Sequence, residues 1–178
     1  MIAMETRHPE TVGTSKGRRS RVLAIAGVLA FVVGFGSVVG GIFGAWYTYD
    51  QAVAQSVVTP DDAAIPETPV RGPFTMWAES DIITQHQLES TEGLYYAEMD
   101  RMVPQLDESG QPVLDDEGEA LMVPNEARAS WLDATGLTTA LGLGIVSYAL
   151  SAFAVAVGLT LMVTGYAFIH IRKRALLI

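Results

Sequence analysis

Two long apolar blocks stand out from an otherwise polar chain. Residues 22–46 and residues 136–169 contain no Asp, Glu, Lys or Arg. A helix needs about 20 apolar residues to cross the hydrocarbon core of a bilayer, and each block is long enough. The alternative is two buried helices in a soluble protein, but a chain of 178 residues offers little interior to hide them. The pattern therefore predicts an all-α membrane protein with two transmembrane helices.

A cleaved signal peptide is a second interpretation of the first block. A basic stretch precedes the block, as a signal peptide requires. The apolar run is much longer than the usual core of about 7–15 residues, however. It also ends at the bulky Trp46 and Tyr47 without a clear small-residue cleavage motif. We therefore expect the first block to remain as a membrane span.

The charges are sorted by segment. Residues 47–135 carry 18 acidic side chains against three arginines, whereas both flanks of the two blocks are basic. Lys and Arg favour the cytoplasmic side of a membrane. The expected order is a cytoplasmic tail (1–21), a first span (22–46), an acidic extracytoplasmic domain (47–135), a long helix that includes the second span (136–169) and a second cytoplasmic tail (170–178). The plasma membrane is the expected location.

Glycines recur at steps of four in the first block, at Gly36, Gly40 and Gly44. Four residues make just over one helical turn, so these glycines predict a shallow groove that another helix can approach closely. Small residues in the second block are expected to fill such a groove: Gly144, Ser147 and Ser151. Pairing within the chain is the simplest use of the groove, and a helix of a partner subunit is the alternative.

The acidic segment divides into a connector, a helical part and an excursion. Four prolines in residues 57–74 predict an extended connector. A helix is expected over 73–90, with Pro73 at its first position. After a break at Gly93, a short helix is expected over 94–101. The segment is therefore predicted to be mainly helical.

The excursion begins and ends with the same tripeptide. Met-Val-Pro occurs at 102–104 and again at 122–124, with two glycine-containing turn signals between the copies. This arrangement predicts an acidic hairpin or loop on the surface. Its carboxylates do not follow the alternating ligand spacing of a calcium loop.

The helix predicted over 73–90 carries the residue types from which chemistry is built. His86 is the only His of residues 47–135, and Glu79 and Glu89 fall on the same side of that helix. The three side chains would suit a divalent metal or general acid–base work. One His with two carboxylates is nevertheless far short of a diagnostic metal motif, and a solvated surface His is the plainer interpretation.

Asp81 is expected on the apolar arc of the same helix, with Phe74 and Trp77. A carboxylate in that position would either stay at the exposed rim of the arc or need a cationic partner. The candidates are the three arginines of the segment: Arg71, Arg101 and Arg128. Tyr95 and Tyr96 are expected to pack on the long second helix with their hydroxyls near water.

Several classes of chemistry have no residues to support them. The chain has no Cys, which excludes disulfides, thiolate ligands and thiol catalysis. It has no glycine-rich phosphate loop and no nucleophile elbow. We therefore predict no catalytic, cofactor-binding or metal-binding residue.

The acidic segment would repel nucleic acid. The basic residues beside the spans are expected to contact anionic lipids: Arg18, Arg19, Arg21, Arg172, Lys173 and Arg174.

The layout, together with the stretch GPF…A..DII..H.L..T.G..YAE at residues 72–98, resembles a family of small actinobacterial two-span membrane proteins. Members often carry the name of an aromatic ring-opening dioxygenase. A non-haem iron site typically needs two His and a carboxylate as ligands. Residues 47–135 contain a single His, His86, so we regard that name as a misnomer. The layout is also similar to accessory subunits of the actinobacterial cytochrome bc–oxidase supercomplex.

Taken together, these features predict a non-enzymatic accessory or scaffold protein of a larger membrane assembly. A respiratory complex is the most concrete candidate partner that the resemblance implies. The side chains expected to contact an extracytoplasmic partner are Phe74, Trp77, Asp81, His86, Tyr95 and Tyr96. The alternative is an extracytoplasmic metal-dependent enzyme that uses His86 with Glu79 and Glu89.

Overall fold

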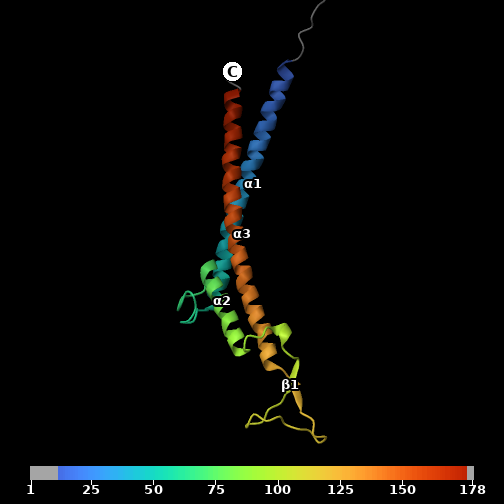
Figure 1. Cartoon of the computed structure of the whole chain (residues 1–178). Coiled ribbons are helices and arrows are strands. Elements are labelled where there is room, and N and C mark those ends of the chain that lie inside the picture. The colour runs from blue at the N-terminus through green and yellow to red at the C-terminus, as the bar shows by residue number, and fades with distance from the viewer. Residues whose placement is uncertain (1–11, 176–178) are drawn as a thin grey trace, which may run out of the picture. The chain divides into compact units, whose positions relative to one another are not determined.

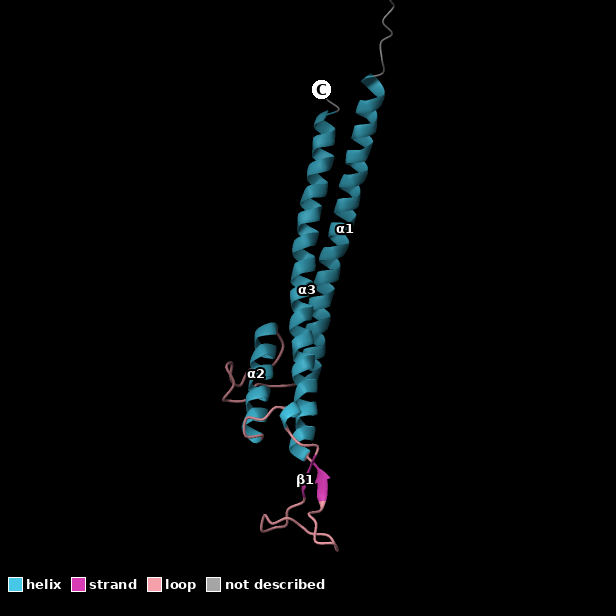
Figure 2. Ribbon diagram, turned by 45° about the vertical axis from the view of Figure 1, so that its right-hand side comes forward, coloured by secondary structure: helices cyan, strands magenta, loops and turns pink. Residues whose placement is uncertain are grey.

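The fold is mostly helical. A computed structural model describes the backbone of residues 12–175 and the side chains of residues 21–173. The order of elements is α1 (Val12–Gln55), α2 (Pro73–Ser90), a 3-10 turn η1 (Tyr96–Glu98), β1 (Met102–Pro104), β2 (Met122–Pro124) and α3 (Glu126–Ala175) (Figures 1 and 2). The helix α1 begins at Val12, ahead of the span expected over 22–46, and residues 1–11 of the expected tail lie outside the described part.

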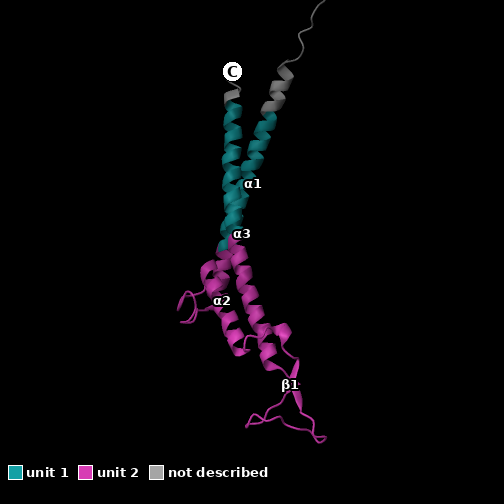
Figure 3. Ribbon diagram, viewed as in Figure 1, with its two compact units in different colours: residues 1–45, 150–178 teal, residues 46–149 magenta. Residues whose placement is uncertain are grey.

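Both expected spans are confirmed as long apolar helices. The candidate segments are Arg21–Gln55 and Glu126–Lys173, each long and apolar enough to cross a membrane. The helix α3 has 50 residues, about 75 Å at 1.5 Å per residue, and α1 has 44. Both are therefore longer than the roughly 30 Å of a hydrocarbon core. The chain divides into two compact units, and each takes part of both long helices (Figure 3).

The first unit, Met1–Ala45 with Leu150–Ile178, is held together by small residues at steps of seven. Each partner meets its counterpart on the other helix, in antiparallel order: Gly27 with Gly165, Gly34 with Gly158 and Gly41 with Ser151. All six residues are buried. A seven-residue step nearly repeats on a helix face and keeps one seam in contact, as in a left-handed helix pair. A hydrogen bond crosses the seam, because the Ser37 hydroxyl donates to the Ala154 carbonyl at 2.8 Å.

The glycines at steps of four do not form this seam. A Cβ added to Gly36 or Gly40 would meet nothing within 4 Å, whereas one on Gly44 would lie 2.8 Å from Ser151 Oγ. The physical reason is angular. At 100° per residue, Gly36 lies about 200° around the helix from the buried Gly34 and so faces away from α3. Within the first unit, pairing of the two helices therefore uses Gly44 and Ser151 of the expected set, and leaves Gly36 and Gly40 clear.

The second unit, Trp46–Ala149, packs α2 against the long helices. The predicted helix over 73–90 is confirmed: Pro73 opens α2, and the Thr75 hydroxyl accepts a hydrogen bond from the Gly72 N–H at 3.1 Å. Its buried residues are Met76, Ala78 and Ile82. After the helix, Gly93 adopts a φ of +84°, and its N–H donates to the Leu88 carbonyl.

The short helix expected over 94–101 is wrong. Only the 3-10 turn Tyr96–Glu98 forms, and Tyr95 before it is extended. Side chains of α3 take the carbonyls that a helix would use: Trp131 Nε1 donates to Leu94 O at 3.0 Å, and Arg128 Nε donates to Tyr96 O at 3.3 Å. These bonds anchor the segment to α3 in a non-helical conformation.

The acidic hairpin is confirmed, and its two Met-Val-Pro copies pair directly. Strands β1 and β2 are antiparallel with Val103 opposite Val123. Beyond them, the backbone of residues 105, 113 and 121 forms a cycle of three hydrogen bonds, each N–H donating to one of the other two carbonyls. Two turns branch from this cycle, closed by Asp107 and Asp115, whose Oδ1 atoms each accept two backbone N–H bonds. The excursion is therefore a fork with two acidic tips.

Candidate functional site

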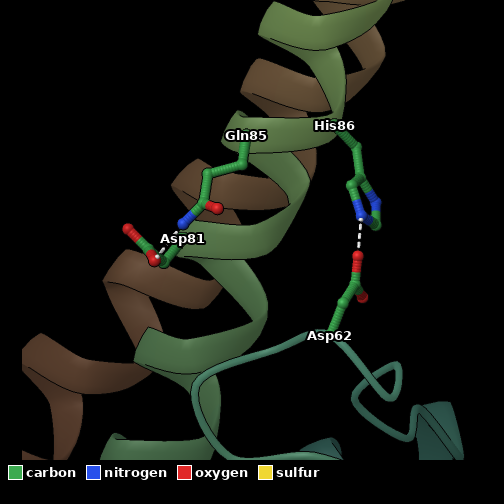
Figure 4. A network of polar contacts seen from close by, with 4 residues as sticks. All are labelled: Asp62, Asp81, Gln85 and His86. Atoms are coloured by element: carbon green, nitrogen blue, oxygen red, sulfur yellow. Dashed lines mark hydrogen bonds and ion pairs between the residues drawn. The ribbon is translucent and has the colours of Figure 1, made fainter.

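His86 is tied to the connector rather than to a metal-binding set. Its Nε2 lies 2.7 Å from Asp62 Oδ2, and both side chains are about half exposed, at 48% and 54% (Figure 4). The hydrogen bond that the Asp62 carboxylate accepts raises the pKa of His86, and the same bond lowers the pKa of Asp62. The contact fixes the loop of residues 60–66 to the outer face of α2.

The set His86, Glu79 and Glu89 is not gathered around one point. Within residues 21–173, no group of three His, Asp or Glu side chains is placed to hold a metal ion. Glu89 is exposed, while Glu79 lines a cleft.

Asp81 does not pair with an arginine. Its Oδ2 accepts a hydrogen bond from Gln85 Nε2 at 2.7 Å, one turn further along α2 (Figure 4). Of the two expectations, the position at the exposed rim holds and the ion pair does not form, because the arc that carries Asp81 is not buried: Phe74 is 78% exposed and Trp77 is 52% exposed. A carboxylate on such a surface keeps its hydration and needs no cation.

The two tyrosines pack on α3 as expected. The ring of Tyr95 lies 5.4 Å from that of Trp131, in a tilted arrangement. The guanidinium of Arg128 lies 3.8 Å from the centre of the Tyr96 ring, within range of a cation–π contact. Trp131 itself is 7% exposed. Both tyrosines thus hold the segment after α2 on the long helix.

The other small residues expected to pack between helices lie in the second unit. Ser147 Oγ is hydrogen-bonded to Thr48 Oγ1 at 2.6 Å, which links α3 to α1. A Cβ on Gly144 would lie 2.7 Å from Met76 Sδ, so this glycine gives room to α2 rather than to α1. Tyr148 also reaches the start of α2, since its hydroxyl donates to the Arg71 carbonyl at 2.6 Å.

A cleft of about 510 Å³ opens within the second unit, and the sequence analysis did not find it. Its wall is almost wholly apolar, and the polar side chains in it are Thr48, Gln51, Gln55 and Glu79. The remaining lining residues are Ala52, Val57, Val70, Met76, Ile83, Leu137, Ala140, Leu141 and Gly144. Ala140 and Gly144 lie four residues apart on α3, so they line the cleft from one face of that helix.

Glu79 is the single ionisable residue in that lining. Its Oε2 atom is buried and has no hydrogen-bond partner among the described residues. Burial raises the pKa of Glu79, and the nearby His86 works against that rise. A carboxyl oxygen in this state lacks the partner that buried polar groups ordinarily have.

The resemblance noted in the sequence finds no independent support from known proteins. Comparison of the chain with protein-family models, with curated proteins and with solved structures found no match.

Proposed function

We propose that this chain is a two-pass integral membrane protein. The support is the exposure of its apolar side chains: in the most apolar windows of the two candidate spans, only 11% and 6% of residues are buried. A core helix of a soluble protein would be mostly covered, because water penalises exposed apolar surface. The hydrocarbon of a bilayer would cover both helices without further protein.

The proposed orientation places both termini in the cytoplasm and residues 47–135 outside. The basic residues before the first span and after the second support it, since Lys and Arg concentrate on the cytoplasmic side. The same residues would then contact anionic lipids of the inner leaflet. The acidic segment, with 18 acids against three arginines, would face the other side.

The proposed role is non-enzymatic: an accessory or scaffold subunit of a larger membrane assembly. One observation carries this role. The seam at Gly27, Gly34 and Gly41 closes the helix pair, while Gly36 and Gly40 stay exposed on the opposite face of α1. Close approach to small residues is what favours helix association in lipid. A second protein's helix would use the face that the chain itself leaves unused.

The exposed Phe74 and Trp77 on α2 offer a second contact outside the membrane. Large aromatic side chains are enriched at the centres of protein interfaces. A respiratory complex is the partner implied by the resemblance and the one to be tested first.

Affinity purification from native membranes in mild detergent, with mass spectrometry of the co-purifying proteins, tests the role. The wild-type chain is expected to bring down membrane subunits in stoichiometric amounts. Gly40→Leu is expected to lose them, while Gly136→Leu is the matched control, because a Cβ at Gly136 also meets nothing within 4 Å. Elemental analysis of the same sample addresses the enzyme alternative. A chain that purifies alone with bound metal would overturn the accessory role.

A further inference from the structure

The cleft in the second unit is built from three helices and has walls suited to an apolar body. Met76 and Ile83 contribute from α2, and Leu137 and Leu141 contribute from α3. Its volume of about 510 Å³ lies within the range of clefts that hold small organic ligands. Ligand sites of this kind combine apolar walls with a few polar groups that fix orientation.

Glu79 supplies such a polar group, and the described part of the chain gives its buried Oε2 atom no hydrogen-bond partner. Gln51 and Gln55 line the same cleft from α1. A half-buried carboxyl in an apolar lining is matched best by a ligand that donates hydrogen bonds and carries positive charge.

The negative charge of the segment around the cleft favours a positively charged ligand. The segment of residues 47–135 has 18 acidic side chains against three arginines, which attracts cations and repels anions. Phosphate-bearing lipids and fatty acids are disfavoured for that reason. A bare metal ion is disfavoured because Glu79 is the single carboxylate of the lining, and the described residues hold no group of three His, Asp or Glu side chains placed around a metal ion.

We propose that this cleft binds a small organic amine, with its apolar body between Met76, Ile83 and Leu141 and its ammonium group on the carboxylate of Glu79, the single ionisable residue of the lining. The ammonium has three protons to donate. Glu79 accepts one of them, and Gln51 and Gln55, which line the same cleft, carry amide oxygens of the acceptor type that the others need. This ligand site does not depend on the proposed membrane assembly, since every lining residue belongs to the second unit.

The test uses the full chain in phosphatidylcholine nanodiscs and three probes of equal length: n-octylamine, 1-octanol and octanoate. Binding is followed by the ¹³C-methyl signal of Met76, with empty nanodiscs titrated in parallel to subtract partition into lipid. We expect n-octylamine to shift this signal with a Kd at least tenfold below that of 1-octanol, and octanoate to leave it unchanged. Equal shifts by amine and alcohol would overturn the proposal.

Matched variants separate the two parts of the site. Glu79→Gln keeps the shape but removes the charge, so the preference for amine over alcohol should disappear. Glu89→Gln changes an exposed carboxylate on the same helix and should keep the preference. Ala140→Phe fills the cleft and should weaken amine and alcohol alike. If Glu79→Gln retained the tenfold preference for the amine, the carboxylate would not be the recognition group.

Discussion

Gly34 of α1 and Gly158 of α3 pack backbone against backbone. A Cβ on either glycine would lie 2.6 Å from the carbonyl oxygen of the other. Real Cβ atoms do not approach an oxygen so closely, and a backbone carbonyl has no rotamer through which to move away. This pair lies in the middle of the seam, with Gly27 and Gly165 on one side and Gly41 and Ser151 on the other.

Replacement of Gly34 should therefore destabilise the helix pair. We expect Gly34→Ala to lower the free energy of unfolding by about 1–3 kcal/mol, the usual range for overpacking. Gly40→Ala is the matched control and should not lower it, since its Cβ meets nothing and Ala favours a helix more than Gly does. SDS titration in mixed micelles, followed by circular dichroism, measures both. Equal losses at the two positions would contradict the seam.

The hydrogen bond across the seam should matter less than the close packing. Ser37→Ala removes the donor to the Ala154 carbonyl. Interhelical hydrogen bonds of this kind contribute about 0.6 kcal/mol on average in membrane proteins. The same SDS titration should therefore rank Ser37→Ala below Gly34→Ala. A larger loss for Ser37→Ala would mean that polar contacts hold the pair together.

Trp131 should be the strongest single anchor of the segment after α2. It is 7% exposed, contacts Tyr95 and donates to the Leu94 carbonyl. Trp131→Ala should cost about 3–5 kcal/mol, as for other large buried side chains. Trp131→Phe loses mainly the hydrogen bond and should cost about 0.5–1.5 kcal/mol.

The control for these changes is Trp77, which is 52% exposed. Trp77→Ala should leave stability almost unchanged in the same denaturation experiment. If it proved as costly as Trp131→Ala, the exposed aromatic arc of α2 would have to be part of a folded core.

The contact between His86 and Asp62 should respond to pH at both ends of a window. The pKa of His86 is raised above its ordinary 6.5. The stabilisation of the folded state by the His86–Asp62 pair is therefore complete below pH 6.5, and it is lost as pH rises through the raised pKa. The pKa of Asp62 is lowered below its ordinary 3.8, so the contribution is lost as pH falls through the lowered pKa. The loop should be tied to α2 between these limits.

An NMR titration of the His86 imidazole measures this effect. Asp62→Asn should bring the pKa of His86 down towards its ordinary value, because the hydrogen bond to the Asp62 carboxylate is the main cause of the raised pKa. Asp61→Asn removes a neighbouring charge and should have a smaller effect. An unchanged titration in Asp62→Asn would show that the contact does not form in solution.

Much of this fold could be predicted from the sequence because its signals are local. Uncharged apolar runs indicated both long helices, and Pro73 fixed the start of α2. The repeated Met-Val-Pro indicated the hairpin, whose strands are those two tripeptides. By contrast, the prediction of a short helix over 94–101 was wrong, because the side chains that bond its backbone carbonyls, Trp131 and Arg128, come from far along the chain.

The contacts between helices were harder to predict. Glycines at steps of four drew attention to Gly36 and Gly40, but the seam follows steps of seven that appear only when both helices are read together. The cleft at Glu79 was missed for a similar reason. Its walls come from α1, α2, α3 and the connector, so its position depends on how Met76 meets Gly144 rather than on any local motif.

The central claim is the two-pass topology, and labelling of single cysteines tests it most directly. The chain has no Cys, so Ser109→Cys and Ser15→Cys each introduce one unique thiol. A membrane-impermeant maleimide added to intact cells should label Ser109→Cys at once, and Ser15→Cys only after lysis. Labelling of Ser15→Cys in intact cells, or protection of Ser109→Cys, would contradict the proposed orientation.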